Sequence, residues 1–349
     1  MNWMIYGANG YTGRLIAVEA ARRGMRPVVA GRNQQEVEDL AAVLDLPSRC
    51  FDLAESARLE RELEEVDVLL HCAGPFSATG LPMLQACLAS GCHYLDITGE
   101  IDWFEQAWSM SDRARRADVV VCPGVGFDVV PTDCLAASLV ERLPAATELT
   151  LAFAAGGGPS PGTARTSLEG MAKGGRVRRD GKIQKVPIAW KTRTIPFARG
   201  PRKAVTIPWG DVFTAWVSTG VPNIEVYLAA SPAALRQMRM LRLLRPLLAA
   251  GWLRDRLQRR IDARVSGPDE EQRRRNGTEV WGEVRSADGR SITGTVTGPN
   301  GYDFTVLGSL GMVEQVLSYR GEGGYFTPSL LAGAGFAATL PGVSLQIEN

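Results

Sequence analysis

The sequence is poor in the residues that build metal centres and in the long apolar runs that cross membranes. Its 349 residues include two histidines, His71 and His93, which excludes a histidine-rich metal site. The six cysteines lack the paired spacing of a metal site and are typical of reduced packing residues (Cys50, Cys72, Cys87, Cys92, Cys122 and Cys134). No run reaches the ~18 uncharged apolar residues of a spanning helix, and the start is a strand rather than a secretory signal. These absences favour a cytoplasmic protein, or one peripheral to a membrane.

The net charge is only +1, but the acidic and basic residues are distributed unevenly along the chain. Residues 1–164 carry 12 Lys and Arg against 22 Asp and Glu, whereas residues 165–264 carry 21 against 6. Residues 265–349 carry 6 against 10. Because summed charge steers association, the basic middle region indicates an acidic partner, substrate or surface.

Glycine is abundant, and three glycines near the start form the strongest motif. A short apolar strand leads into Gly7-Ala-Asn-Gly10-Tyr-Thr-Gly13, and a helix follows as far as Gly24. Between a strand and a helix this spacing predicts a dinucleotide site. The first glycine permits the turn, the second lets the backbone approach a pyrophosphate, and the third lets the helix pack on the strand. The helix N-terminus offers N–H groups to the phosphates, so we expect cofactor contacts from Gly7, Asn9, Gly10, Tyr11, Thr12 and Gly13.

The end of the second predicted strand indicates which dinucleotide binds. NAD-preferring sites usually carry Asp or Glu there for the ribose 2′-hydroxyl, whereas this chain has Gly31-Arg32-Asn33. The guanidinium of Arg32 suits a 2′-phosphate and can stack on adenine, so the sequence favours NADP(H), with Asn33 beside it. The alternative is an ordinary solvated arginine. The first acidic residue, Glu36, is interpreted as part of the first turn of the next helix.

Strands and helices alternate over the first 130 residues, which predicts a parallel sheet covered on both faces. Helices are expected at 34–44, 56–64, 81–90 and 103–116, with short apolar strands between them. Ligands lie beyond the carboxyl ends of such strands, so the segments after the strands should line one crevice. Those segments are 7–13, 31–33, 73–76, 98–100 and 123–128.

From residue 131 the pattern changes to that of an antiparallel sheet with helices. Strands are expected at 148–155, 183–190, 203–208, 212–219, 223–229, 279–286 and 291–297, followed by a helix at 309–319. The turns at 179–181 and 287–289 contain Asp-Gly, which is typical of hairpins. The predicted fold class is α/β, with an N-terminal Rossmann-type parallel-sheet domain at 1–130. An α+β substrate domain with a largely antiparallel sheet covers 131–308, and segment 309–349 returns to the first domain.

The chain resembles the saccharopine dehydrogenase-like oxidoreductases, particularly the branch of trans-acting enoyl reductases. The resemblance spans nearly the whole chain, at 7–13, 30–32, 72–76, 92–100, 123–133, 162–170, 178–182 and 323–329. It implies an NADP-binding Rossmann domain, an α/β catalytic-like domain and a C-terminal segment folding back on the first. It is much less specific for substrate, because members act on carbon–nitrogen bonds, reduce enoyl thioesters or have no settled activity.

Three polar residues near the predicted strand ends are candidates for catalysis. Hydride transfer is the cofactor's own chemistry, so the protein is expected to supply placement, polarisation and a proton. Asp128 and Glu100 each follow a strand end, and Tyr94 lies close behind. The alternatives are helix capping or loop hydrogen bonding for Asp128, a helix start for Glu100, and water as the proton source.

Further cofactor contacts are expected after the third and fourth strands. Asp52 lies where it can reach the adenine amino group, or alternatively cap the next helix. Ala73, Gly74 and Pro75 form a turn with little side chain, which lets the ribose and nicotinamide pass close to the backbone. Phe76 can flank the nicotinamide ring or pack in the core.

A basic helix is expected over residues 233–264, where Arg236, Arg239, Arg242 and Arg245 recur at every third position. One interpretation is a solvated face, and the other is docking to an acidic carrier protein or an anionic membrane surface. Nucleic-acid binding is not expected, since no recognised fold accompanies the charge. A homodimer is one allowed assembly.

Three functional hypotheses follow. The leading one is an NADPH-dependent reductase of an apolar enoyl or carbonyl compound, free or carrier-bound. The first alternative is a carbon–nitrogen oxidoreductase acting on an amino-acid-derived imine, with Arg165, Arg176 and Arg178 as partners for its carboxylates. The second is a non-catalytic NADP-binding scaffold at lipid surfaces.

Overall fold

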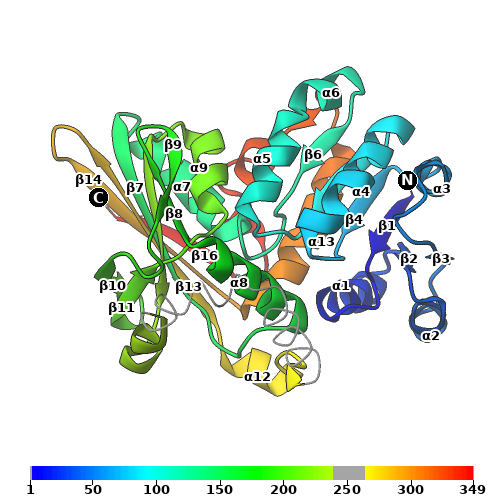
Figure 1. Ribbon diagram of the computed structural model, residues 1–349, viewed down its shortest axis with the longest axis horizontal. Coiled ribbons are helices and arrows are strands. Elements are labelled where there is room, and N and C mark those ends of the chain that lie inside the picture. Colours follow the sequence, from blue (N-terminus) through cyan, green and yellow to red (C-terminus); the bar gives the residue numbers. More distant parts are fainter. Residues whose placement is uncertain (1, 239–263, 349) are drawn as a thin grey trace. The chain divides into compact units, whose positions relative to one another are not determined.

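The structure is a computed structural model that describes residues 2–238 and 264–348. The chain divides into two compact units, each of which contains its own sheet (Figure 1). The first unit comprises Met1–Val130 and Tyr302–Ala332, and the second comprises Pro131–Gly301 and Gly333–Asn349. The last part of the chain is therefore shared, because residues 302–332 belong to the first unit and residues 333–349 to the second.

The first unit alternates strands and helices. Its elements are β1 (Trp3–Tyr6), α1 (Tyr11–Arg22), β2 (Val28–Gly31), α2 (Gln34–Leu44), β3 (Ser48–Cys50), α3 (Ser56–Leu63), β4 (Val68–His71), α4 (Phe76–Ser90), β5 (His93–Asp96), α5 (Ile101–Ser109), α6 (Ser111–Arg116), β6 (Val120–Cys122), α13 (Gly301–Ser318), β15 (Gly324–Tyr325) and α14 (Pro328–Ala332). The expected helix at 103–116 is in fact two helices, α5 and α6.

All seven strands of this unit form one parallel sheet in the order β15-β6-β5-β4-β1-β2-β3. The central strands β1 and β4 are buried along their whole length, as their continuous apolar sequences require. From β1 the chain moves to one side of the sheet and from β4 to the other. Because parallel crossovers are right-handed, the α1–α2 pair and the α4–α5 pair cover opposite faces. This doubly wound order confirms the predicted Rossmann-type sheet.

The second unit is built on a mixed sheet. Its elements are α7 (Val130–Arg142), β7 (Ala146–Ala154), α8 (Pro161–Lys173), β8 (Gly175–Arg179), β9 (Lys182–Val186), β10 (Thr192–Phe197), β11 (Gly200–Thr206), α9 (Asp211–Thr219), β12 (Asn223–Ala229), α12 (Glu270–Arg275), β13 (Thr278–Ser286), β14 (Ser291–Gly298), α15 (Phe336–Thr339) and β16 (Ser344–Glu348).

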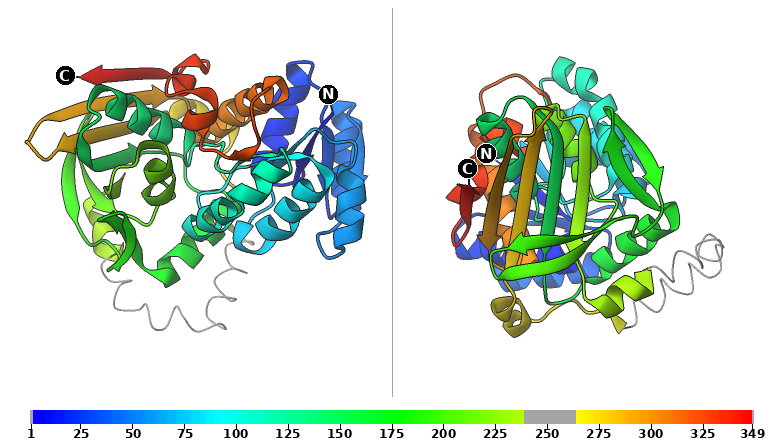
Figure 2. Two further views of the ribbon diagram at one scale, coloured as in Figure 1. Left: turned by 90° about the horizontal axis from the view of Figure 1, so that it is seen from above. Right: turned by 90° about the vertical axis from the view of Figure 1, so that its left-hand side faces the viewer.

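The second sheet follows the order β10-β11-β12-β7-β13-β14-β16, with β8 and β9 attached through β12 (Figure 2). Only the β12–β7 pair among these is parallel, so the prediction of a largely antiparallel sheet is confirmed. One face packs against α7, and Gly282 of β13 makes this close approach possible. A Cβ there would lie 2.8 Å from Leu139 Cδ1 and 3.0 Å from Leu135 Cδ2.

One predicted strand is wrong, because residues 212–219 form most of helix α9. Their β-branched and aromatic residues favour a strand locally, but tertiary packing overrides that preference. The Arg178 guanidinium stacks 4.2 Å from the Trp216 ring centroid, and its Nε donates to the Val212 carbonyl at 2.7 Å. Gly220 ends the helix with a φ of +72°, and its N–H donates to the Trp216 carbonyl.

Most of the expected basic helix, residues 239–263, lies outside the described residues, so that prediction has no structural counterpart here. Within 2–238 and 264–348, none of the helices combines the length and the apolar composition that crossing a bilayer requires.

Candidate functional site

The loops that follow β1 and β4 meet where the chain reverses its direction across the parallel sheet. A Cβ on Gly7 would lie 2.8 Å from the backbone nitrogen of Ala73 and 2.9 Å from its Cβ, so the two loops touch. Gly7 also has a φ of +83°, which other residues rarely adopt. Open parallel sheets bind their ligands at such a switch point. Both space and backbone conformation therefore require the first glycine of the motif.

The surrounding structure constrains the other two glycines of the motif to different degrees. A Cβ on Gly13 would lie 2.3 Å from the Gly7 carbonyl oxygen, so the packing of α1 against the first loop requires a glycine. Gly10 is exposed, and a Cβ there would meet only the Gly7 carbonyl oxygen, at 3.3 Å. Gly10 is also the N-cap of α1 and provides no side-chain cap. A Cβ at position 10 would thus be tight against one backbone oxygen only, so the fold demands glycine less strongly here than at positions 7 and 13, and the exposed backbone stands at a helix N-terminus suited to phosphate.

The end of β2 presents an exposed arginine beside a buried glycine. Gly31 is buried and Arg32 is exposed, and no hydrogen bond or ion pair with the rest of the described chain engages the Arg32 guanidinium. The Asn33 side chain accepts from the Glu36 N–H at 3.4 Å and so caps α2. Asn9 Nδ2 donates to Glu36 Oε2 at 2.7 Å, which ties the loop after β1 to the first turn of α2.

Asp52 lies beyond β3 but does not cap the helix that follows. Its Oδ1 accepts from the Ala54 N–H at 2.8 Å, whereas the N-cap of α3 is Glu55. The nearby Tyr6 hydroxyl donates to the Phe51 carbonyl at 3.0 Å. Burial, together with the charge of Asp52, raises the pKa of Tyr6 to about 12, so this phenol stays protonated. Asp52 is left on the surface at the strand end where the adenine was expected.

The loop after β4 is held by a carboxylate from the loop after β5. Glu100 Oε1 accepts from the Phe76 N–H and Oε2 from the Ser77 N–H, both at 2.8 Å. These are the first two residues of α4, so Glu100 satisfies N–H groups that the helix cannot use internally. Phe76 itself is buried, with its ring 5.2 Å from the His71 ring in an edge contact. The turn Ala73–Phe76 is thereby fixed at the carboxyl edge of the sheet.

A second carboxylate, Asp96, joins the ends of β5 and β6. Its Oδ1 accepts from the backbone N–H groups of Thr98 and Gly124, each at 2.9 Å. Its Oδ2 accepts from the Tyr94 hydroxyl at 2.8 Å and from Trp103 Nε1 at 2.6 Å. Burial is the largest influence and raises the pKa of Asp96 to about 6, even though all four donors lower it. The fully buried Tyr94 is thus engaged in this network.

Asp128 follows β6 and lies against the loop after β5. A Cβ on Gly99 would be 2.7 Å from Asp128 Oδ2, so the carboxylate contacts the backbone of that loop. Helix α13 supports the same segment, because the Phe127 N–H donates to Thr305 Oγ1 at 3.0 Å. Burial raises the pKa of Asp128 to about 7, which makes it a group that can hold or release a proton near neutrality.

This region of the chain is similar to a known family. Residues 3–122, about a third of the chain, match the sequence model of the saccharopine dehydrogenase NADP binding domain. The cofactor is NADP(H), and the residues present fit that cofactor: the exposed backbone of Gly10 stands at the N-cap of α1, and Arg32 is exposed at the end of β2.

Similar proteins carry names from the same group. A saccharopine dehydrogenase-like oxidoreductase of Bos taurus is 29% identical over 150 residues, covering 37% of this chain and 35% of that protein. A probable mitochondrial saccharopine dehydrogenase-like oxidoreductase of Arabidopsis thaliana is 32% identical over 147 residues, covering 37% of this chain and 32% of the relative. A trans-acting enoyl reductase of Mycobacterium leprae is 29% identical over 151 residues, covering 40% and 35%. The chain spans about a third of the length of these relatives.

The fold beyond the NADP-binding domain also has a solved counterpart. The apo, histidine-tagged saccharopine dehydrogenase (L-Glu forming) from Saccharomyces cerevisiae aligns with a TM-score of 0.66 over 100% of both chains. Its sequence identity is 13%, so the likeness shows the fold alone. It confirms the predicted α/β class with a second, sheet-based unit.

Sequence reasoning missed two groups that shape this domain. Asp96 was not singled out, because its four donors come from residues up to 28 positions away and only the folded chain unites them. Helix α13 was expected only from residue 309, yet it begins at Gly301 and brings Tyr302 to the glycine loop. The Tyr302 ring lies 4.9 Å from the Tyr11 ring in an edge contact. The signal in the sequence that could have indicated this contact was an aromatic residue, Tyr302, at the start of a helix.

The two histidines of the NADP-binding domain are structural. His71 is fully buried, its Nε2 lies 3.0 Å from Thr79 Oγ1, and burial lowers the pKa of His71 to about 3. His93 accepts from the Val120 N–H through Nδ1 at 3.1 Å, and burial lowers its pKa as well. Burial therefore favours the neutral form of both imidazoles at physiological pH.

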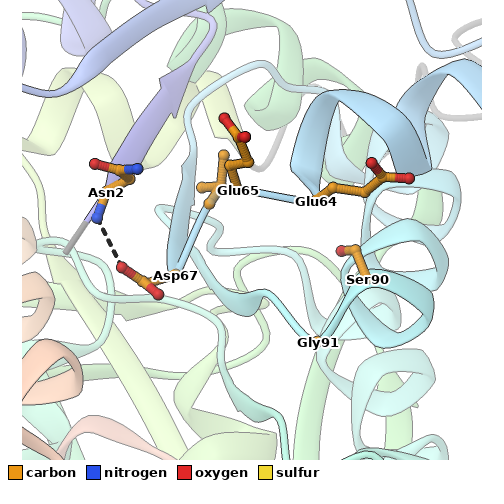
Figure 3. A pocket seen from close by; sticks show the side chains of 7 residues that line it. Asn2, Glu64, Glu65, Asp67, Ser90 and Gly91 are labelled. Carbon is orange, nitrogen blue, oxygen red and sulfur yellow. Dashed lines mark hydrogen bonds between the residues drawn. The ribbon is translucent and has the colours of Figure 1, made fainter.

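A polar pocket lies at the opposite edge of the parallel sheet. It has a volume of about 510 Å³ and is lined by residues before β1, β4 and β5, among them Asn2, Glu64, Glu65, Asp67 and Ser90 (Figure 3). The Asn2 N–H donates to Asp67 Oδ2 at 2.7 Å. Three carboxylates gather there, which disfavours phosphate binding, and the pocket lies at the edge opposite the one where the cofactor is expected.

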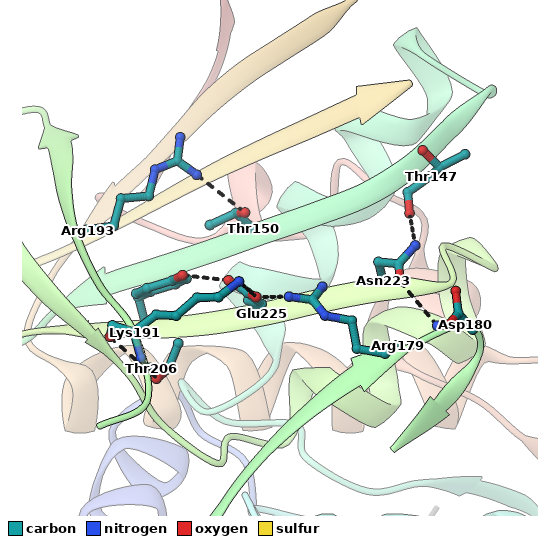
Figure 4. Close-up of polar contacts among 10 residues, drawn as sticks. Thr147, Thr150, Arg179, Asp180, Lys191, Arg193, Thr206, Asn223 and Glu225 are labelled. Carbon is teal, nitrogen blue, oxygen red and sulfur yellow. Dashed lines mark hydrogen bonds and ion pairs between the residues drawn. The ribbon is translucent and has the colours of Figure 1, made fainter. Parts of the chain in front are cut away.

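In the second unit, the cations near the expected substrate region already have partners. Glu225 of β12 is buried and binds both Arg179 and Lys191, the latter with Nζ at 2.6 Å (Figure 4). Arg178, one of the arginines considered for substrate carboxylates, is buried and donates to the carbonyls of Val212 and Gly181. Its guanidinium is therefore engaged by the fold.

Proposed function

We propose that this chain is an NADPH-dependent reductase of an apolar enoyl or carbonyl compound, free or carrier-bound. The proposal rests on one observation: three features suited to binding NADPH and donating a proton lie at the same edge of one sheet. That edge holds an open phosphate cradle at Gly10, an exposed arginine at position 32 and a carboxyl group of near-neutral pKa at position 128. When bound, NADPH supplies the hydride. The chain supplies binding, orientation and a proton.

Cofactor binding is assigned to the residues expected from the sequence. The N–H groups at the start of α1, at Tyr11, Thr12 and Gly13, hold the pyrophosphate together with the Gly7–Gly10 loop. Arg32 binds the 2′-phosphate, and Asn33 and Asp52 border the adenosine end. The turn Ala73–Phe76 lines the nicotinamide end, where its small residues let the ring pass close to the backbone.

Asp128 is the proposed proton donor. A carboxyl with a pKa of about 7 is protonated in a substantial fraction of molecules at neutral pH and can deliver its proton as the substrate gains negative charge. Glu100 and Tyr94 are the other catalytic candidates, and their partners support positioning roles. Glu100 caps the helix after the nicotinamide turn, and Tyr94 donates to Asp96 beneath the loop that contacts Asp128.

The substrate class rests on the names of the relatives. A relative named trans-acting enoyl reductase favours carbon–carbon double-bond reduction on a substrate presented by another protein. The excess of basic residues at 165–264 is compatible with an acidic carrier. We assign the chain to the cytoplasm, with peripheral membrane contact as a further option. The imine alternative is weaker, since Arg178 is committed to backbone carbonyls.

The decisive assay is NADPH consumption against a panel of enoyl thioesters, ketones and imines. We expect turnover with an apolar enoyl or carbonyl substrate, at a rate that falls above about pH 7 as Asp128 ionises. Asp128→Asn should abolish that pH dependence and lower kcat by roughly 10²-fold. Turnover with imines alone would favour carbon–nitrogen chemistry, and tight NADPH binding without any turnover would favour the scaffold alternative.

A further inference from the structure

Arg32 is exposed at the end of β2, and two acidic residues, Asp52 and Glu36, belong to the segments after β3 and at the start of α2. Asp52 and Arg32 both act electrostatically on the Tyr6 hydroxyl, and Glu36 follows Arg32 by four residues. Neither acid forms an ion pair with Arg32 in the part of the chain that the structure describes. Because exposed ion pairs are weak, a surface arginine can exchange a carboxylate partner for a phosphate, and a carboxylate that is free to reach it would compete with that phosphate.

Each of the two carboxylates is held by a different donor. Asp52 Oδ1 accepts from the Ala54 N–H at 2.8 Å, which keeps it in its own loop. Glu36 Oε2 accepts from Asn9 Nδ2 at 2.7 Å, a side chain that comes from the loop after β1. The second contact is the more informative, because it is made between two exposed or half-exposed side chains rather than by the backbone.

Asn9 is placed where its side chain can hold the Glu36 carboxylate. A Cβ on Gly31 would lie 2.7 Å from Asn9 Oδ1, so the Asn9 side chain packs on the backbone just before Arg32. Its Nδ2 then points at Glu36 and holds that carboxylate from the side of the glycine loop. Because an amide cannot deprotonate, Asn9 offers this donor at every pH.

We propose that Asn9 is a specificity-determining residue, which restrains Glu36 so that Arg32 stays available for the 2′-phosphate of the cofactor. The inference rests on the proposed role of Arg32 and deepens it. Without the Asn9 amide, the Glu36 side chain is released and pairs with Arg32, in competition with the phosphate. NADH lacks that phosphate, so its binding depends on Asn9 much less.

The test is a double-mutant cycle read as dissociation constants of NADPH and NADH, measured by calorimetry. Asn9→Ala should weaken NADPH binding by roughly five- to tenfold more than NADH binding. Adding Glu36→Gln to Asn9→Ala should restore most of the NADPH preference, since a neutral side chain cannot pair with Arg32. The loss in Asn9→Ala should also shrink as NaCl is raised, because exposed pairs are screened.

Glu38→Gln in the Asn9→Ala background is the matched control, as it removes an equal charge from the exposed surface of the same helix. Rescue by Glu36→Gln but not by Glu38→Gln supports the proposal, whereas equal rescue by both means that general electrostatics decide cofactor choice and overturns it. Equal losses for NADPH and NADH in Asn9→Ala, without rescue, also overturn it. Should Asn9→Ala fold poorly by its melting curve, Asn9→Ser replaces it. Arg32→Ala tests the proposed role of Arg32 separately from that of Asn9. If the preference for NADPH survives Arg32→Ala, the proposed role of Arg32 is wrong.

Discussion

The two halves of the parallel sheet hold their strand-end loops in different ways. In the β1–β3 half, glycines let backbone segments touch, and the polar side chains, Asn9, Arg32 and Glu36, are exposed or half-exposed. In the β4–β6 half, two carboxylates are turned inward: Asp96 takes four hydrogen bonds and Glu100 caps α4.

The difference matches the role that we propose for each half. A loop that recognises phosphates needs open backbone and unpaired positive charge, which costs little stability because both remain hydrated. A loop that places a reactive ring needs a fixed backbone, and buried charge-assisted hydrogen bonds provide that at the expense of desolvation. Substitutions in the first half should therefore change cofactor binding, and substitutions in the second should change folding.

The largest effect is expected at Asp96. Asp96→Ala leaves four buried donors without their acceptor and should lower the free energy of unfolding by about 3–5 kcal/mol. Chemical denaturation measures this, with Glu105→Ala on the exposed surface of α5 as a control that changes stability by less than about 0.5 kcal/mol. If Asp96→Ala does not fold, Asp96→Asn should show a smaller loss in the same direction. Equal stability of the Asp96 and Glu105 variants would break the comparison.

A smaller effect is expected at Glu100. Glu100→Gln keeps one acceptor oxygen but sets an amide N–H₂ against a backbone N–H, so unfolding should become easier by about 1–2 kcal/mol. Amide hydrogen exchange at Phe76 and Ser77 should accelerate, because these N–H groups lose a charged acceptor. Glu105→Gln is the matched control. Unchanged exchange at both amides would show that the cap does not hold the loop after β4.

A further effect, which depends on pH, is expected at Asp128. The folded pKa of about 7 lies above the unfolded value of about 4, so between these values the folded state binds more protons and stability falls as pH rises. Asp128→Asn should gain stability over the parent from pH 4 to 7, by about 4 kcal/mol at most, and the gain should stay constant above pH 7. Thermal melts across this range measure it. If the gain in stability is already present at pH 4, it comes from packing and not from the ionisation of Asp128.

The sequence was informative wherever short-range patterns decide structure. The glycine motif, the arginine at the end of β2 and the strand–helix alternation all depend on neighbours in the chain, and the parallel sheet followed from them. Residues 212–219 failed because a buried arginine and a terminal glycine turn a strand-like segment into α9. Asp96 and Thr305 could not be found, since their hydrogen bonds join residues 28 and 178 positions apart. The role of Glu100 was missed in part, because it caps the helix before it rather than the helix it begins.

The central claim is that Gly10 is kept free of a side chain for a bound dinucleotide and not for the fold. Titration of NADPH into the parent protein and into Gly10→Leu tests it most directly, with melting temperatures measured on the same samples. The account predicts tight binding by the parent, a loss of at least about 100-fold in Gly10→Leu, and only a modest fall in the melting temperature without ligand, because a Cβ at position 10 would be tight against the Gly7 carbonyl oxygen alone, at 3.3 Å. Undiminished NADPH binding by a folded Gly10→Leu protein would contradict it.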